Sequence, residues 1–200
     1  SADVPPNHAE FGRLLSCECQ LPRLEKERYA RLLRYSNLAD LKRFKFESLR
    51  QDIARDSQLE QYNSALEAAE SYSMDPRDWI VFTGKYDPMK MKLAAAIGNR
   101  CLEQGHVLLF MHVPDLLDHL RESFTPTGDV TYSELFDQVR NTPLLILDDL
   151  GSHSTTPWAE EKLRQIINHR YNVELPTVIT TTAELDEVDP YISSRIRSLG

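Results

Sequence analysis

The stretch WIVFTGKYDPMKMKLAAAIGNRCL, residues 79–102, decides the fold of this chain. Its first residues, 79–83, form an apolar run that suits a short buried strand. A loop with glycine and proline follows, and residues 92–102 are rich in alanine, which is typical of a core helix. The stretch therefore predicts a strand, a loop and a helix, in that order.

The same alternation continues along the chain. Apolar runs that suit strands recur at residues 107–112, 144–147 and 177–181. Helices are predicted between them, one of them capped by Thr131 or Ser133 and the last at residues 158–171. Buried strands separated by helices are typical of a parallel sheet covered on both faces, so we expect a three-layer α/β domain. A sheet that ends at its fourth strand leaves an open edge, which also predicts shortening at the C-terminus.

Charge divides the chain into two parts. The net charge is −8, yet residues 23–50 hold nine basic residues against four acidic ones. We predict a basic helical segment at residues 1–57, with a helix at about 21–35 and a polar linker at 51–58, and an α/β core at residues 58–200. The basic segment is either an interaction arm or a solvated helix face, and the acidic remainder argues against a whole-surface nucleic-acid binder.

Several classes of protein are disfavoured by composition. No apolar run approaches the roughly 20 residues of a membrane helix, and the N-terminus lacks the pattern of a signal peptide. The three cysteines, Cys17, Cys19 and Cys101, do not suggest a disulfide framework. We therefore expect a cytoplasmic protein with no membrane partner.

The loop after the first predicted strand resembles a phosphate-binding loop. Gly84 and Lys90 match two of the four fixed positions of the pattern G-x-x-x-x-G-K-[ST]. Met89 stands at the second glycine, where we expect its bulk to obstruct the approach of the backbone to phosphate. Met91 replaces the hydroxyl that binds Mg²⁺, and a thioether is a poor ligand for that cation.

Two further residues of the loop oppose phosphate binding. Pro88 has no N–H to donate, and Asp87 places a negative charge near the position of a polyphosphate. Together with the two methionines, these changes predict a P-loop frame without tight Mg-ATP binding.

Acidic residues follow the third predicted strand. Asp148 and Asp149 end the run LLILDDLG, residues 144–151. A buried strand followed by carboxylates is the Walker-B arrangement, in which one acid holds Mg²⁺ and the next polarises water. The alternative is that Asp148 only caps the following turn.

The second half of the chain resembles a known family. The segments VPDLLDHLRESF, TYSELFDQVRNTPLLILDDLG, WAEEKLRQIINHRYN and PTVITTT are similar to the AAA+ domain of bacterial replicative helicase loaders and of IstB-like transposition ATPases. The resemblance extends from about Phe11 to Arg195. It implies a P-loop NTPase fold of the AAA+ type, with ATP and Mg²⁺ as cofactors.

The resemblance also implies roles for single residues. Lys90 matches the Walker-A lysine, Asp148 the Mg²⁺ ligand and Asp149 the acid that polarises water. Arg195 resembles the arginine that reaches into the site of a neighbouring subunit. Thr182 stands where the family usually has a sensor asparagine, so an amide that orients water is missing.

The family's N-terminal zinc module is matched only in part. The stretch FGRLLSCEC resembles its second half, which would make Cys17 and Cys19 two of four zinc ligands. Two thiolates do not close a tetrahedral site, so zinc is not expected. The implied activity is ATP-controlled loading of a hexameric helicase onto single-stranded DNA, with the helicase or another AAA+ protein as partner.

Three hypotheses about function follow. The first is a pseudo-ATPase that serves as a binding or regulatory module in DNA replication. The alternative is an active ATP-dependent helicase loader, because Lys90, Asp148, Asp149 and Arg195 all survive. A third is a loop adapted to another anion through Lys85, Lys90 and Lys92.

A separate stretch is the candidate for contact with single-stranded DNA. Lys42, Arg43 and Lys45 alternate with Phe44 and Phe46, which suits phosphate contact and base stacking. The competing interpretation, which we favour for the two phenylalanines, is that they are docked on the core.

Overall fold

The computed structural model describes residues 30, 33–55, 57–84, 87–124, 130–152, 156–183 and 188–198. The chain divides into two compact units, Ser1–Leu33 and Arg34–Gly200, and the description below concerns the second. Most of the predicted helix at residues 21–35 lies outside the described residues, as do Cys17, Cys19 and Lys85. None of the helices within the described ranges is long and apolar enough to cross a membrane.

Four parallel strands form a single sheet in the order β1-β4-β3-β2. Their bounds are Trp79–Phe82 for β1, Leu108–His112 for β2, Leu144–Leu150 for β3 and Thr177–Thr181 for β4. The prediction that the fourth strand leaves an open edge is wrong, because β4 lies between β1 and β3 and all five of its residues are buried. The edges of this sheet are β1 and β2.

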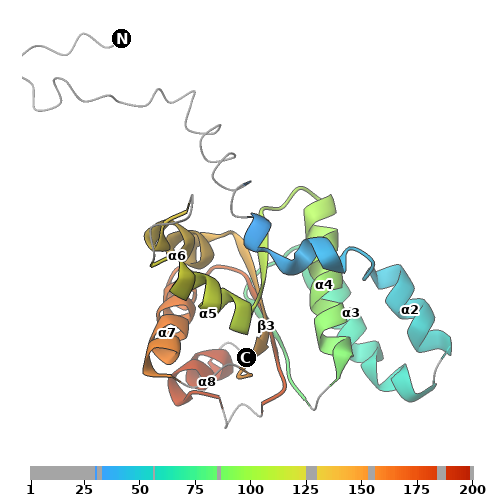
Figure 1. Ribbon diagram of the computed structural model, residues 1–200. Coiled ribbons are helices and arrows are strands. Elements are labelled where there is room, and N and C mark those ends of the chain that lie inside the picture. Colours follow the sequence, from blue (N-terminus) through green and yellow to red (C-terminus); the bar gives the residue numbers. More distant parts are fainter. Residues whose placement is uncertain are drawn as a thin grey trace, which may run out of the picture. The chain divides into compact units, whose positions relative to one another are not determined.

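Helices cover both faces of the sheet, as predicted for a three-layer α/β domain (Figure 1). On one side lie α2 (Phe46–Arg55), α3 (Asn63–Met74) and α4 (Pro88–Glu103). On the other lie α5 (Val113–Glu122), α6 (Tyr132–Asn141), α7 (Pro157–Asn172) and α8 (Pro190–Arg197). Helix α4 begins four residues before the predicted start at residue 92, because Asp87 caps it and Pro88 occupies a position in the first turn where no N–H is needed.

Small residues let α4 pack closely on the sheet. Ala94, Ala95 and Ala96 are at most 1% exposed. A Cβ atom added at Gly98 would lie only 3.0 Å from Ile146 Cδ1, so glycine permits the closest approach. The alanine-rich run that predicted a core helix is thus explained by contact with β3.

Residues 34–55 pack with the core, although the sequence suggested that they belong to a separate segment ending at residue 57. The segment forms η1 (Leu33–Tyr35), η2 (Asn37–Leu41) and α2, and η3 (Ser57–Tyr62) follows. Phe46, Leu49 and Ile53 are at most 4% exposed, so the predicted polar linker at 51–58 is instead helical as far as Arg55. Its apolar residues recur at helical spacing and belong to the hydrophobic core cluster, which explains the difference.

The start of this segment also protects an edge of the sheet. Ser36 Oγ accepts a hydrogen bond from the Phe110 N–H at 3.1 Å, and Asn37 Oδ1 accepts one from the His112 N–H at 3.1 Å. Both N–H groups belong to the edge strand β2. Two side chains thereby satisfy donors that would otherwise invite another strand.

A buried arginine fixes the strand that enters the centre of the sheet. Arg170 has no exposed surface and donates to the carbonyl oxygens of Thr142 at 2.7 Å and Pro176, and to Thr177 Oγ1 at 2.9 Å. Burial lowers the pKa of its guanidinium to about 9. These bonds tie α7 to the start of β4 and so set where the other end of β4 lies.

Candidate functional site

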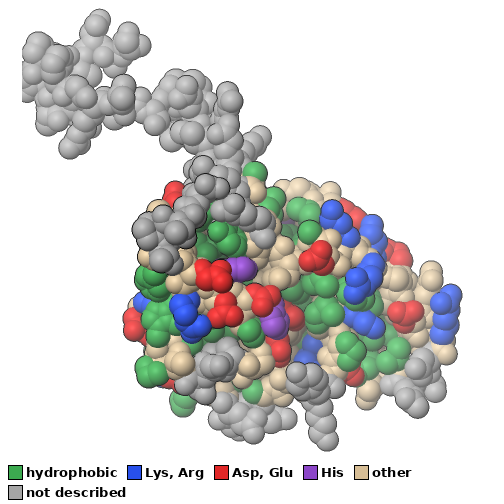
Figure 2. Space-filling model, in the orientation of Figure 1, with side chains coloured by type: hydrophobic (Ala, Val, Ile, Leu, Met, Phe, Trp, Pro, Cys, Tyr) green, Lys and Arg blue, Asp and Glu red, His purple; other side chains and the backbone are tan. Residues whose placement is uncertain are grey.

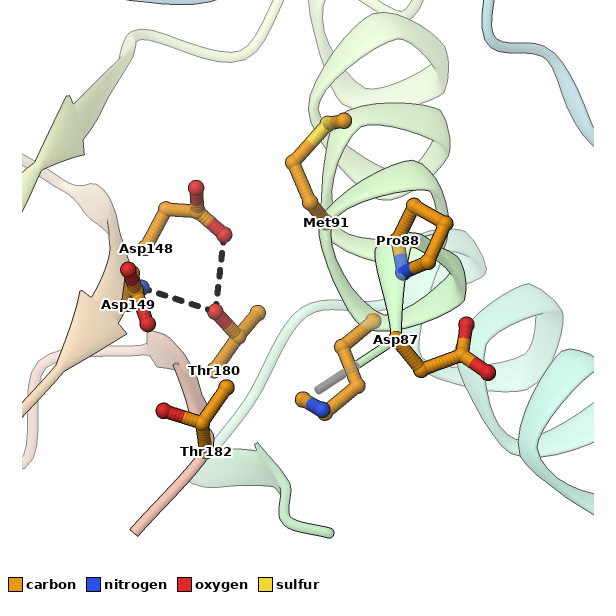
Figure 3. A pocket seen from close by; sticks show the side chains of 8 residues that line it. Asp87, Pro88, Met91, Asp148, Asp149, Thr180 and Thr182 are labelled. Carbon is orange, nitrogen blue, oxygen red and sulfur yellow. Dashed lines mark hydrogen bonds between the residues drawn. The ribbon is translucent and has the colours of Figure 1, made fainter. Parts of the chain in front are cut away.

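A cavity of about 250 Å³ lies where the parallel strands end (Figure 3). It is lined by Asp87, Pro88, Lys90, Met91, Asp148, Asp149, Thr180 and Thr182. Ligands of parallel sheets bind at the carboxyl ends of the strands. The predicted phosphate loop and the predicted acidic strand end do meet there. Gly84 and Arg195, also predicted as site residues, are not among the lining residues.

Asp87 caps the helix that follows the loop. Its Oδ1 accepts a hydrogen bond from the Met89 N–H at 2.6 Å, and its Oδ2 accepts one from the Tyr62 hydroxyl. Burial opposes ionisation of this carboxyl, but the bonds from Tyr62 and Met89 and the charges of Lys90 and Lys92 outweigh it and lower the pKa. The charge predicted at this position is therefore present, and it lies at the first turn of α4.

Lys90 is folded back onto its own loop. Its side chain is buried, and its Nζ donates to the Gly84 carbonyl oxygen at 2.9 Å. Gly84 has a φ of +129°, a conformation that other residues rarely adopt. The two positions that match the phosphate-loop pattern therefore contact each other.

The two methionines of the loop differ in environment. Met89 is 2% exposed, belongs to the hydrophobic core and does not line the cavity. We expected its bulk to obstruct the approach of the backbone to phosphate, but the side chain lies on the same buried face of α4 as Leu93. Met91 does line the cavity and lies across from Asp148 (Figure 3).

The acidic side of the cavity is organised by a threonine. Thr180 Oγ1 donates to Asp148 Oδ1 at 2.7 Å and accepts from the Asp149 N–H at 2.9 Å (Figure 3). The carboxylate of Asp148 thus contacts the neighbouring strand β4. Asp149 has a φ of +61° at an irregularity in the β3–β4 register, which turns it away from regular strand geometry.

Burial governs the charge of Asp148. Its side chain is 7% exposed, and burial raises its pKa although the hydrogen bond from Thr180 opposes the shift. His112, which pairs in register with Asp148, places Nε2 3.8 Å from Asp149 Oδ2 and Nδ1 3.3 Å from Asp115 Oδ1. Among the described residues, no group of three or more His, Cys, Asp or Glu side chains is arranged to hold a metal ion.

Sequence reasoning missed two residues of this site. Thr180 lies within the predicted strand TVITT, and a polar residue near the end of a buried strand was the available signal. Tyr62 had no such signal, because it precedes Asp87 by 25 positions and reaches it only through the packing of α3 on α4.

Arg195 lies on α8 between two aromatic rings. Its guanidinium carbon is 4.7 Å from the centre of the Tyr171 ring and 5.0 Å from that of Tyr191, and it donates to the Tyr191 hydroxyl at 3.2 Å. Its predicted role in the site of a neighbouring subunit stays a prediction.

The predicted nucleic-acid residues are largely engaged within the chain. Arg43 donates to the Asp40 carbonyl oxygen and lies 4.5 Å from the Phe44 ring centre, and Lys45 pairs with Glu103 at 2.7 Å. Lys42 is exposed. Figure 2 shows most of the Lys and Arg side chains of the pictured face over the α2–α4 side, with some acidic side chains among them.

The aromatic residues between these cations serve the core. Phe46 is 2% exposed, and Phe44 is partly buried against the same cluster. The interpretation that both are docked on the core is confirmed. Contact with single-stranded DNA through Lys42, Arg43 and Lys45 stays a prediction.

Curated relatives of this chain are helicase loaders. It is 29% identical over 139 residues to the replicative helicase loader DnaI of Bacillus subtilis (strain 168), covering 68% of this chain and 44% of that protein. It is 26% identical over 117 residues to the replicative helicase loader DnaC of Escherichia coli (strain K12), covering 58% and 47%. The chain thus spans slightly less than half the length of these two relatives.

Solved structures agree with this relationship. The crystal structure of the DnaC helicase loader matches with a TM-score of 0.60 and 25% identity, covering 69% of this chain and 86% of that chain. A structure of AMPPCP-bound DnaA from Aquifex aeolicus, at 20% identity and a TM-score of 0.60 over 68% and 44% of the two chains, shares the fold.

The sequence profile described as IstB-like ATP binding protein matches residues 11–194. The match includes both sides of the cavity, the loop after β1 and the carboxyl end of β3. The resemblance noted from the sequence is confirmed at this level: the chain belongs to the IstB-like ATP-binding family and is an AAA+ protein related to the helicase loaders DnaC and DnaI.

Proposed function

We propose that this chain is a helicase-loader-type AAA+ module that has lost Mg-ATP hydrolysis and acts by binding a protein partner, the replicative helicase or another AAA+ protein. The main evidence for this proposal is the position of Met91 in the cavity. Its side chain lines the cavity across from Asp148, where a hydroxyl would share a Mg²⁺ ion with that carboxylate (Figure 3). A thioether does not replace this oxygen ligand.

The phosphate side of the cavity supports the same proposal. A polyphosphate needs inward N–H groups and a lysine to bind its oxygens. Here the Met89 N–H is bonded to Asp87, the Lys90 ammonium is bonded to Gly84, and Pro88 has no N–H. The residues present do not fit Mg-ATP, and we derive no hydrolytic step through it.

The partner is inferred from the relatives. Two curated relatives are replicative helicase loaders, and the DnaC loader structure matches 69% of this chain with a TM-score of 0.60. Retention of the fold around an altered loop suits a module that uses its surface to bind a partner and does not hydrolyse ATP. The proposed role is therefore binding or regulation during DNA replication.

A second candidate function is an active, ATP-dependent loader. It is favoured by one observation: Lys90, Asp148 and Asp149 line one cavity together with the hydroxyl-bearing Thr180 and Thr182. If a ligand could draw Lys90 away from Gly84, the charged groups of a nucleotide site would be in reach.

Titration with a fluorescent ATP analogue in Mg²⁺ separates the two. The unaltered protein is compared with a variant that carries Asp87→Gly, Pro88→Thr and Met91→Thr and keeps Met89, because Met89 is part of the core. We expect micromolar binding by the variant and no binding in that concentration range by the unaltered protein. Asp148→Asn in the variant should remove the Mg²⁺ dependence of binding and is the matched control.

Micromolar binding of Mg-ATP by the unaltered protein, with measurable hydrolysis, would contradict the proposal and favour the active loader. Absence of binding by both proteins, when both unfold cooperatively at similar denaturant concentrations, would contradict the view that the loop alone disables the site.

A further inference from the structure

We propose that Tyr62 and Asp87 form an autoinhibitory latch, in which the chain's own carboxylate occupies the first turn of α4 and excludes the phosphate groups of a ligand. Asp87 Oδ2 accepts from the Tyr62 hydroxyl, and Oδ1 accepts from the Met89 N–H at 2.6 Å. The inference rests on the proposed function only in taking the cavity as the place where a nucleotide would lie.

The location of the carboxylate explains why it competes with phosphate. The N-terminus of a helix carries a partial positive charge and free N–H groups, which bind anions. In this chain, Asp87 already supplies the anion at α4, within the field of Lys90 and Lys92. A phosphate group entering from the cavity must displace this carboxylate or accept its repulsion.

Tyr62 holds the carboxylate from a different element. It lies at the junction of η3 and α3, and its side chain is partly buried against the hydrophobic core. The ring therefore presents the hydroxyl from a fixed position. Because Tyr62 touches Asp87 and is not among the residues that line the cavity, it is a positioning residue that acts through Asp87.

This arrangement makes the apparent affinity depend on how often the latch is open. A ligand that binds only the open state binds more weakly in proportion to the closed fraction. Removing the Tyr62 hydroxyl raises the open fraction and keeps the ring in the core. Removing the Asp87 carboxylate abolishes the competing anion altogether.

The test measures binding of fluorescently labelled ADP without divalent cations, by anisotropy, in the full chain. Tyr62→Phe is expected to raise the affinity about tenfold, the lower end of the scale of a hydrogen bond to a charged group. Asp87→Ser keeps a good helix cap and is expected to raise the affinity about twentyfold. The double variant should match Asp87→Ser, because Tyr62 acts only through Asp87.

Tyr72→Phe is the matched control. Tyr72 lies on the same helix α3, and its hydroxyl donates to the Asp78 carbonyl oxygen at 3.2 Å, away from the loop. This variant should leave the affinity unchanged. Chemical denaturation of each variant checks that the fold is kept.

The latch is overturned if Tyr62→Phe binds like the unaltered protein while Asp87→Ser binds more tightly, since the tyrosine would then play no part. It is also overturned if Asp87→Ser does not improve binding, or if the two changes add in the double variant. The proposed function fails by a different observation, namely that the unaltered protein binds and hydrolyses Mg-ATP.

Discussion

The loop after β1 and the end of β3 face the same cavity, and they differ in how their polar groups are held. In the loop, Asp87 and Lys90 bond to the backbone of their own segment, at Met89 and Gly84. At the end of β3, Asp148 bonds across strands to Thr180. The polar groups of the loop are thus bonded within their own segment, whereas the carboxylate at the end of β3 is bonded to the neighbouring strand β4.

The difference shows that frame and site are maintained by different residues. Met89 and the helix α4 belong to the packed core, whereas Gly84 is needed for its φ of +129° and not for packing. At the strand end, Thr180 holds the Asp148 carboxylate and the Asp149 N–H, and His112 lies near the Asp149 carboxylate. A change in ligand chemistry can therefore be confined to the loop and leave the sheet unchanged.

The largest expected effect distinguishes the two methionines of the loop. Met89→Gly should lower the free energy of unfolding by about 3–5 kcal/mol, because it empties a buried site and places glycine in a helix. Met91→Ala, at the cavity, should cost about 1 kcal/mol or less. Urea denaturation of both variants measures the effect, and equal losses would contradict the placement of Met89 in the core.

An intermediate effect is expected at Asp87. Its folded-state pKa is lowered, so its ionised form stabilises the fold above the unfolded pKa, and this contribution is lost as the pH falls through the folded pKa. Asp87→Ala should therefore cost about 1–2 kcal/mol at pH 7, as for a lost helix cap. The difference should shrink at low pH, and a loss that does not depend on pH would argue against a charged cap.

The smallest expected effect has the opposite sign. Burial raises the folded-state pKa of Asp148, so its ionisation opposes folding above the unfolded pKa, and that cost disappears as the pH falls below it. Asp148→Asn keeps an oxygen for Thr180 and should stabilise the protein by about 0.5–1 kcal/mol at neutral pH.

The Asp148→Asn gain should vanish in acid, as denaturation midpoints at neutral and acidic pH would reveal. Asp149→Asn, at a more exposed carboxylate, is the control and should change stability less. A destabilised Asp148→Asn variant at neutral pH would mean that the carboxylate is better paired than its burial indicates.

Much of the fold follows from local sequence. Four apolar runs predicted the four strands, and the alanine-rich run after the loop predicted α4. Buried strands and helices can be predicted because the spacing of apolar residues along the sequence depends on which face of the element is buried. The helix at residues 46–55 was missed, since its three buried residues stand among polar ones and their common face is evident only in the packed core.

The candidate site was predictable in its residue types and only partly in its contacts. The sequence by itself determined that Lys90, Met91, Asp148 and Asp149 follow strands of a parallel sheet, and so that they meet at one edge. Strand order, the burial of Met89 and the bonds of Asp87 to Tyr62 and Asp148 to Thr180 were decided by tertiary structure alone. These contacts join residues distant in the chain, and only packing in three dimensions brings them within hydrogen-bonding distance.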